Sequence, residues 1–143
     1  MAVASILAQK GRDVVTALPD RSLQDVATIL AERKIGAIVI TDAQGKVLGM
    51  LSERDIVRAM AREGASALDD PVSRHMTERV VTTTEEATIP DTMELMTSGR
   101  FRHLPVIAND RLVGMISIGD IVKWRLGEYE AEQEALRDYI KTA

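Results

Sequence analysis

Hydrophobic and polar positions follow a strand-like period in some stretches of the chain and a helical period in others. A β-branched run at 13–17 precedes a segment, 22–34, whose apolar residues recur every three or four positions. Two more apolar runs, 37–41 and 46–51, flank a turn signal, and a second helical pattern covers 53–63. This order predicts a β-α-β-β-α unit.

The second half of the chain repeats this pattern. Residues 14–16 and 80–82 are the same Val-Val-Thr triplet, and GMLSERD at 49–55 returns as GMISIGD at 114–120. The turn that precedes the heptad is one residue shorter in the second copy. Because a repeat of this kind is one supersecondary unit that packs on its copy, we expect two units side by side.

The unit boundaries follow from where the repeat begins and ends. We expect a first unit with an N-terminal extension over 1–63, a connector over 64–77, a second unit over 78–126 and a C-terminal helical extension over 127–143. The connector is assigned from its Gly, Pro and paired Asp residues. The expected fold class is α+β.

Both ends of the chain carry apolar residues beyond the repeat. VASILA, at 3–8, precedes the first unit, and a loose apolar stripe runs from Ile121 to Ile140 amid Glu and Arg. Two interpretations of the stripe stay open, a helix folded back over its own unit or a dimer contact. We expect a homodimer to which VASILA and the stripe add apolar surface.

Composition narrows the possible functions. The chain of 143 residues has a net charge of −4 and only one Trp, two Tyr and one Phe, which disfavours a nucleic-acid surface. It has no Cys, which excludes disulfides and cysteine nucleophiles and agrees with a reducing, cytoplasmic compartment. No apolar run approaches the roughly 20 residues of a membrane span, and no signal peptide is expected.

The repeated heptad places Ser at its fourth position and Asp at its seventh. Ser52 and Asp55, like Ser117 and Asp120, stand where a strand gives way to a helix. A Ser followed three residues later by an acidic residue is typical of a capping box, in which the two side chains bind each other's backbone N–H groups. This interpretation needs no ligand.

Other features of the heptad favour a ligand. Gly49 and Gly114 fall within strands, where Gly weakens the strand unless a backbone or a ligand comes close. A helix N-terminus beside a hydroxyl group suits phosphate, and a carboxylate one turn further on suits the hydroxyls of a ribose. Together these groups indicate a nucleotide.

The β-α-β-β-α unit with its G-h-h-S-x-x-D heptad, where h is apolar, resembles the cystathionine β-synthase (CBS) domain. Two such units in tandem resemble a Bateman module, over about residues 10–126, and RHLPV at 102–106 strengthens the resemblance. The resemblance implies two units packed about a pseudo-two-fold axis. It also implies two clefts for adenosine-containing ligands, namely AMP, ADP, ATP, NAD or S-adenosylmethionine.

The same resemblance implies roles for individual residues. Asp55 and Asp120 match the aspartates that bind ribose, and Ser52 and Ser117 match the hydroxyl groups near phosphate. A further set of residues is expected to contact the ligand. They lie before the first strand of each unit, beside the adenine ring, or at the start of the middle strand. These residues are Lys10, Gly11, Thr77, Val14, Val80, Gly36, Ala37, Arg54, Phe101, Arg102 and His103.

The two clefts are not expected to be equal. Arg102 and His103 correspond to Gly36 and Ala37 in the first copy, so the basic pair is present only once. We expect the cleft anchored by Asp120, with Thr77, Arg102, His103 and Ser117, to hold a phosphorylated ligand more tightly. The side chains of such a module can reach into the neighbouring cleft.

The chemistry of the sequence does not favour an enzyme. It has no cysteine, no His cluster for a metal, no Ser-His-acid set and no Walker-type phosphate loop. We expect a stand-alone regulatory module that binds an adenine nucleotide, has no catalytic cofactor and signals to an unknown partner, with no role for nucleic acid or membrane. The alternative is a structural or interaction scaffold in which the Ser-Asp pairs are only helix caps.

Overall fold

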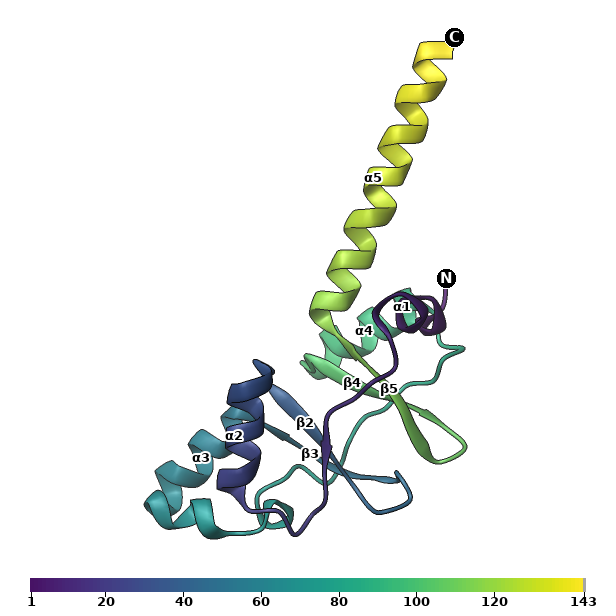
Figure 1. Ribbon diagram of the computed structural model, residues 1–143. Helices are drawn as coiled ribbons and strands as arrows, with labels where there is room; N and C mark the ends of the chain where they lie inside the picture. The colour runs from purple at the N-terminus through teal and green to yellow at the C-terminus, as the bar shows by residue number, and fades with distance from the viewer. Residues whose placement is uncertain (143) are drawn as a thin grey trace.

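Two small β-sheets lie at the centre of the molecule with helices around them (Figure 1). The computed structural model describes residues 1–142. In the first unit, β1 (Thr16–Ala17) pairs in parallel with β2 (Ala37–Thr41), which pairs in antiparallel fashion with β3 (Val47–Ser52). The apolar faces of α2 (Leu23–Arg33) and α3 (Glu53–Glu63) complete the core of this unit.

The second unit repeats the arrangement with a smaller sheet. Antiparallel strands β4 (His103–Ala108) and β5 (Arg111–Ser117) form this sheet. Helix α4 (Ile89–Gly99) and the start of α5 (Ile118–Thr142) supply buried residues to its core. The α+β fold of two tandem units with a long C-terminal helix is therefore confirmed.

The strand predicted at 80–82 is wrong, because those residues do not pair as a strand. Thr83 alone bridges Val106 in parallel. Its N–H donates to the oxygen of Pro105, and its oxygen accepts from the N–H of Ile107, each at 2.9 Å. Six residues earlier, Thr77 pairs with Met50 of the first unit.

The repeat extends to the ends of the helices. Ser22 caps α2 and Thr88 caps α4, each accepting a hydrogen bond from the N–H three residues on. Both helices also end on a left-handed residue, Lys34 with φ 54° and Arg100 with φ 58°. The two copies therefore share local backbone geometry as well as strand order.

Helix α1 (Val3–Lys10) begins the chain but lies in the core of the second unit. Val3 and Leu7 are fully buried, and the Val3 N–H donates to the oxygen of Ala87. Leu7 packs directly against Gly114 of β5, where an added Cβ would lie 2.8 Å from the leucine side chain. The expectation that VASILA adds surface to a dimer interface is therefore wrong, because its own chain already covers these side chains.

The connector makes the reciprocal contact. After the short 3-10 helices η1 (Gly64–Asp69) and η2 (Val72–Arg74), Thr77 pairs with Met50 of β3 through two backbone hydrogen bonds of 2.9 and 3.0 Å. Gly49 allows this approach, since an added Cβ would lie 2.8 Å from the Thr77 oxygen. Each unit is thus completed by the segment that leads into the other unit. We call residues 1–15 and 76–82 the two leading segments.

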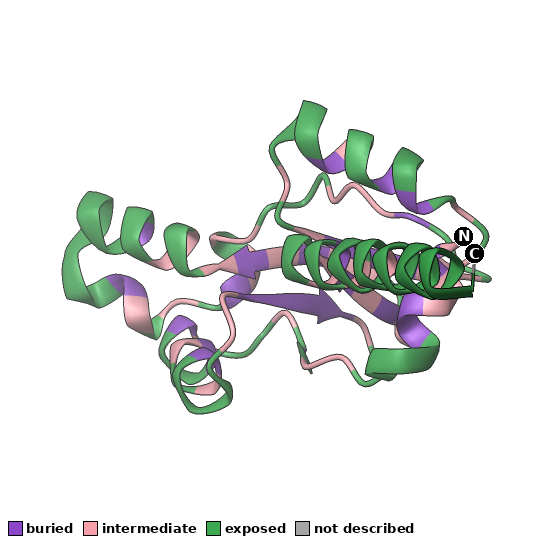
Figure 2. Ribbon diagram, turned by 90° about the horizontal axis from the view of Figure 1, so that it is seen from above, coloured by how far each residue is buried: buried purple, intermediate pink, exposed green. Residues whose placement is uncertain are grey.

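Helix α5 leaves the body of the molecule and projects away from it (Figure 1). Its first turns pack on the second unit through Ile121 and Trp124, but every residue over 129–142 is exposed (Figure 2). A helix folded back over its own unit is therefore excluded for this segment. Among residues 1–142, no helix has the length and apolar character needed to cross a membrane.

The close approach at Gly49 gives a test of the contact between the second leading segment and the first unit. Gly49→Ala should destabilise the protein by about 1–3 kcal/mol, because the new methyl group meets the Thr77 backbone and the Met76 side chain. Gly127→Ala is the control, since nothing lies within 4 Å of that position and Ala favours a helix by about 1 kcal/mol. Chemical denaturation of both variants measures the effect, and equal stabilities for the two would contradict the contact.

Candidate functional site

Both repeated heptads form reciprocal caps at the start of a helix. The Ser52 N–H donates to Asp55 Oδ2 at 2.8 Å, and the Asp55 N–H donates to Ser52 Oγ at 3.3 Å. Ser117 and Asp120 repeat the pair of bonds at 2.9 and 3.1 Å. The capping interpretation is therefore satisfied in each copy. The Asp55 carboxylate accepts hydrogen bonds from the Ser52 N–H and the Ser52 hydroxyl, both at Oδ2, and within residues 1–142 no hydrogen bond to its Oδ1 is found.

A cleft of about 390 Å³ opens beside the first of these caps. We call it the Asp55 cleft. Its size lies in the usual range for small-molecule sites. Both units and the second leading segment line it, with these residues: Gly36, Ala37, Met50, Ser52, Glu53, Arg54, Asp55, Arg58, Thr77, Arg79, Val80, Val81, Arg100, Phe101, Arg102 and His103.

The Asp55 cleft is rich in positive charge. Five arginines line it, against the carboxylates of Glu53 and Asp55. Arginine binds phosphate through a planar fork of N–H donors, so a cluster of this kind favours a polyanionic ligand. The apolar part of the lining includes Val80, Val81 and Phe101. The cleft can thus hold a molecule with one apolar end and one anionic end.

The second ribose-type aspartate is already engaged within the chain. Lys10 Nζ lies 2.6 Å from Asp120 Oδ2 and donates to the oxygen of Met115 at 2.8 Å. Burial raises the pKa of Asp120, but the Lys10 ammonium and the Ser117 N–H outweigh burial and hold that pKa below its ordinary value. Asp120 is therefore an ionised partner of Lys10, whereas no such cation is paired with Asp55 among the described residues.

His103 lies between the two aspartate sites. It lines the Asp55 cleft, pairs with Ser117 in the β4–β5 register, and feels the charge of Asp120. Burial lowers the pKa of His103 below its ordinary value, and the positive charges of Lys10 and Arg102 add to this effect while Asp120 opposes it. The imidazole is consequently neutral near pH 7.

The structure distributes the expected site residues unequally. The Asp55 cleft brings together Gly36, Ala37, Ser52, Arg54, Asp55, Thr77, Val80, Phe101, Arg102 and His103. Lys10, Ser117 and Asp120 form a separate group at the second cap. Gly11 is exposed with no atom within 4 Å of an added Cβ, and Val14 is half-buried outside the lining of the Asp55 cleft.

This distribution corrects the expected composition of the two clefts. Thr77, Arg102 and His103 were assigned to the cleft of Asp120, but they line the cleft of Asp55. The reason is the exchange of leading segments, since Thr77 pairs with Met50 and so lies beside the first cap. The alignment of the two copies was sound, but it does not show which unit each leading segment reaches.

Several lining residues were not anticipated from the sequence. Arg58 lies one turn beyond Asp55 on α3, so helical spacing alone could have placed it on the same face. Arg79 lies two residues after Thr77, and Arg100 is the left-handed residue that ends α4. No sequence pattern indicates that these last two residues reach the first unit.

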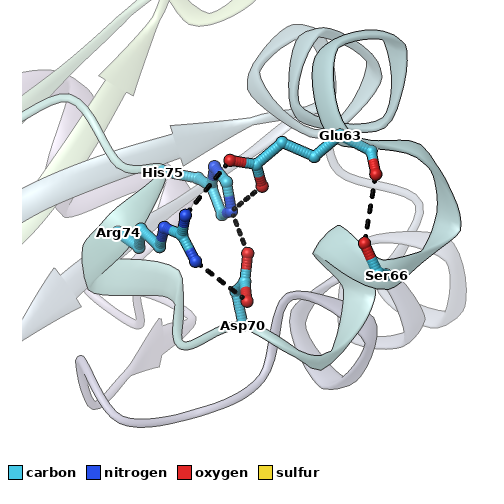
Figure 3. Close-up of polar contacts among 5 residues, drawn as sticks. All are labelled: Glu63, Ser66, Asp70, Arg74 and His75. Atoms are coloured by element: carbon cyan, nitrogen blue, oxygen red, sulfur yellow. Dashed lines mark hydrogen bonds and ion pairs between the residues drawn. The ribbon is translucent and has the colours of Figure 1, made fainter.

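A second polar cluster lies in the connector (Figure 3). His75 Nε2 lies 2.8 Å from Asp70 Oδ2 and 3.6 Å from Glu63 Oε2, and its side chain is only 3% exposed. The three side chains have the spacing of metal ligands. However, the Arg74 guanidinium reaches both carboxylates at 3.3–3.4 Å and balances their charge. The hydrogen bond to His75, with Arg74 nearby, lowers the pKa of Asp70. We therefore interpret the cluster as an ion-pair network that fixes the connector.

The fold and the paired caps together define the class of this protein. The family model for the CBS domain matches the chain twice, over residues 4–62 and 72–127. The chain therefore belongs to the CBS domain family. The match covers both units and includes α1 and the start of α5.

Known relatives agree with this assignment. A crystal structure of a CBS-domain-containing protein from Agrobacterium tumefaciens, ATU1752, is 52% identical with a TM-score of 0.83, and the alignment covers 87% of this chain and 99% of that one. The mitochondrial CBS domain-containing protein CBSX3 of Arabidopsis thaliana is 30% identical over 97% of this chain and 71% of its own length. An uncharacterised 17.7 kDa protein of Acidianus ambivalens is 35% identical, and the alignment covers 73% of this chain and 63% of that protein.

A further solved structure contains ligands. The CBS domain pair of protein MJ0100 was solved with 5′-methylthioadenosine and S-adenosyl-L-methionine. It is 26% identical with a TM-score of 0.79, and the alignment covers 90% of this chain and 98% of that one. Domain pairs of this family therefore include one that holds adenosine compounds.

The lowered pKa of His103 predicts how stability depends on pH. In the unfolded chain, His has a pKa of about 6.5, so acidification protonates the unfolded state first. The contribution of His103 to the free energy of unfolding should therefore be complete above about pH 6.5, decrease as the pH falls below it, and level off below the folded-state pKa. Urea denaturation between pH 8 and 5 should show this decrease in the wild type, and His103→Gln should remove it. Parallel curves for the two proteins would rule out the effect.

Proposed function

We propose that this protein is a regulatory module that binds an adenosine-containing nucleotide in the Asp55 cleft and catalyses no reaction. The single observation that carries the proposal is the meeting of Asp55 with five arginines, contributed by both units, in one cleft. The adenosine compounds in the related MJ0100 pair support the ligand class. AMP, ADP, ATP and NAD(H) all combine a ribose with phosphate and remain candidates.

The lining of the cleft suits the parts of such a ligand. The oxygen Oδ1 of Asp55 is available to accept a ribose hydroxyl, because the cap uses Oδ2. Val80 and Val81 offer apolar surface to an adenine ring, and Arg102 offers its guanidinium to phosphate. A ligand held in this way contacts both units at once, so it favours one arrangement of the two.

This bridging position is how the module would transmit a signal. A ligand shifts a conformational equilibrium only by binding one state more tightly, and a cleft shared by two units provides such a difference. We propose that a regulated partner protein detects the ligand-bound arrangement and that the module acts as a homodimer. We also propose a cytoplasmic location, which the absence of Cys supports.

The second candidate is a scaffold without a ligand. The complete capping boxes at Ser52 and Ser117 favour it, because they give each Asp a structural role. The positive charge of the Asp55 cleft favours the nucleotide, since caps alone do not require five arginines at one place.

Replacement of the ribose-type carboxylate separates the two candidates. Asp55→Ala should weaken AMP binding by roughly 10- to 100-fold, as expected for loss of a charge-assisted hydrogen bond. Asp25→Ala is the matched control, because Asp25 occupies the third position of α2 behind Ser22 but is absent from the cleft lining. Calorimetry measures both affinities. Unchanged binding in Asp55→Ala, or equal losses in the two variants, would support the scaffold.

Removal of one arginine tests the phosphate contact. Arg102→Ala should weaken AMP roughly tenfold or more but leave adenosine almost unchanged, because only AMP carries the phosphate. Arg111→Ala changes an exposed arginine on the β4–β5 hairpin that follows Arg102, and it should affect neither ligand. Titration of each variant with AMP and adenosine gives the comparison. Equal losses for the two ligands would mean that Arg102 shapes the cleft without touching phosphate.

A further inference from the structure

The exposed part of α5 carries an apolar seam with a seven-residue repeat. Along this seam, successive residues lie alternately four and three positions apart in the sequence, and all but one of them are apolar. If Leu126 is a heptad a position, then a and d residues alternate along the helix. We define the seam by these positions: Val122 (d), Leu126 (a), Tyr129 (d), Gln133 (a), Leu136 (d) and Ile140 (a).

The seam has no partner among residues 1–142. Its apolar members are 51–64% exposed, although large apolar side chains are usually covered. The residues that fix α5 to the body, Ile121 and Trp124, occupy other heptad positions, so the body does not use the seam. A helix standing alone in water gains little stability from its own hydrogen bonds. The projecting half of α5 (Figure 1) therefore requires a packing partner.

The flanking charges indicate which partner fits. From Arg125 to Arg137, the g and e positions that border the seam are Arg125 and Glu132 at g and Glu130 and Arg137 at e. In a parallel pair of helices, each g residue faces the e residue of the following heptad on the partner. Arg125 then faces Glu130 of a second copy, and Glu132 faces Arg137 of a second copy. Both contacts join opposite charges, so the seam is complementary to itself.

The polar position in the seam also favours a defined pairing. Gln133 is an a residue, and its amide Nε2 donates to the Tyr129 hydroxyl at 2.9 Å within the same helix. In a parallel pair, identical a residues face each other, so Gln133 meets its own copy and can share hydrogen bonds across the seam. A polar residue at one a position fixes register at some cost in stability.

We infer that α5 forms a parallel two-stranded coiled coil with α5 of a second copy of this chain. This inference names the surface of the homodimer proposed above and rests on that part of the proposal. It is independent of the Asp55 cleft, which lies on other elements. Parallel pairing places the two bodies at the same end of the coil, because both helices leave their bodies at the N-terminal end.

Mass measurements on the full chain test the seam. The wild type should sediment at twice the 15.7 kDa of one chain, and Leu136→Asp should halve that mass at the same protein concentration. Glu132→Arg should weaken the dimer roughly tenfold, since it sets like charges against each other in both symmetric contacts. The double variant Glu132→Arg, Arg137→Glu should restore the dimer. Glu134→Lys, at an outer b position, is the control and should leave the mass unchanged.

Cross-linking tests the direction of the helices. Because the chain has no Cys, a single Cys variant reports only its own position. Leu126→Cys should form a disulfide with its own copy in a parallel coil. In an antiparallel pair, Leu126 faces the region of Ile140, and the two introduced thiols lie about 20 Å apart. A disulfide found only in a mixture of Leu126→Cys with Ile140→Cys would overturn the parallel arrangement.

The outcomes distinguish this inference from the wider proposal. A monomeric wild type at high concentration would overturn both the homodimer and the coiled coil. A Leu136→Asp variant that stays dimeric would overturn the coiled coil and leave the homodimer to other surfaces. A thermal shift by AMP that persists in monomeric Leu136→Asp would show that the nucleotide site is intact, whatever the result for α5.

Discussion

The exchange of leading segments is the contact on which the rest of the structure depends. The backbone of Thr77 pairs with β3 of the first unit, and α1 completes the core of the second unit against β5. Gly49 and Gly114 occupy equivalent positions, and the absence of a side chain at each leaves room for these two contacts. Each unit is thus completed by the segment that leads into the other unit. This exchange holds the two caps and the Asp55 cleft in one body.

The same exchange explains why the two aspartate sites differ. The first leading segment presents the Lys10 ammonium to Asp120, whereas the equivalent residue of the second leading segment is Met76, which carries no charge. A lysine that binds the carboxylate competes with a ribose, while a methionine does not. Both copies therefore keep the cap, but the Asp120 carboxylate is paired with a cation of the chain, and no such cation is found at Asp55 within residues 1–142. Arg102 lines the Asp55 cleft, although the alignment of the copies alone places it at the Asp120 cleft.

Periodicity was sufficient to predict the local structure, because the bounds of β2, α3 and α4 follow apolar spacing and capping residues. It could not predict where α1 lies or that 80–82 fails to pair, since both depend on contacts between segments distant in sequence. The residues Ser52 and Asp55 were identified from their spacing, yet the arginines from α4 and the second leading segment reach the cleft only through tertiary packing. The exposed seam of α5 was visible as a loose stripe, but only the structure separates Ile121, which faces the body, from the rest.

The number of nucleotides bound per chain tests the central claim most directly. Isothermal titration calorimetry of the full chain with AMP should give one strong site per chain, because Asp55 is open to a ligand and Asp120 is held by Lys10. Any second binding event should be weaker by a large factor. Two sites of equal affinity per chain, or one site that survives Asp55→Ala and disappears in Asp120→Ala, would contradict the account.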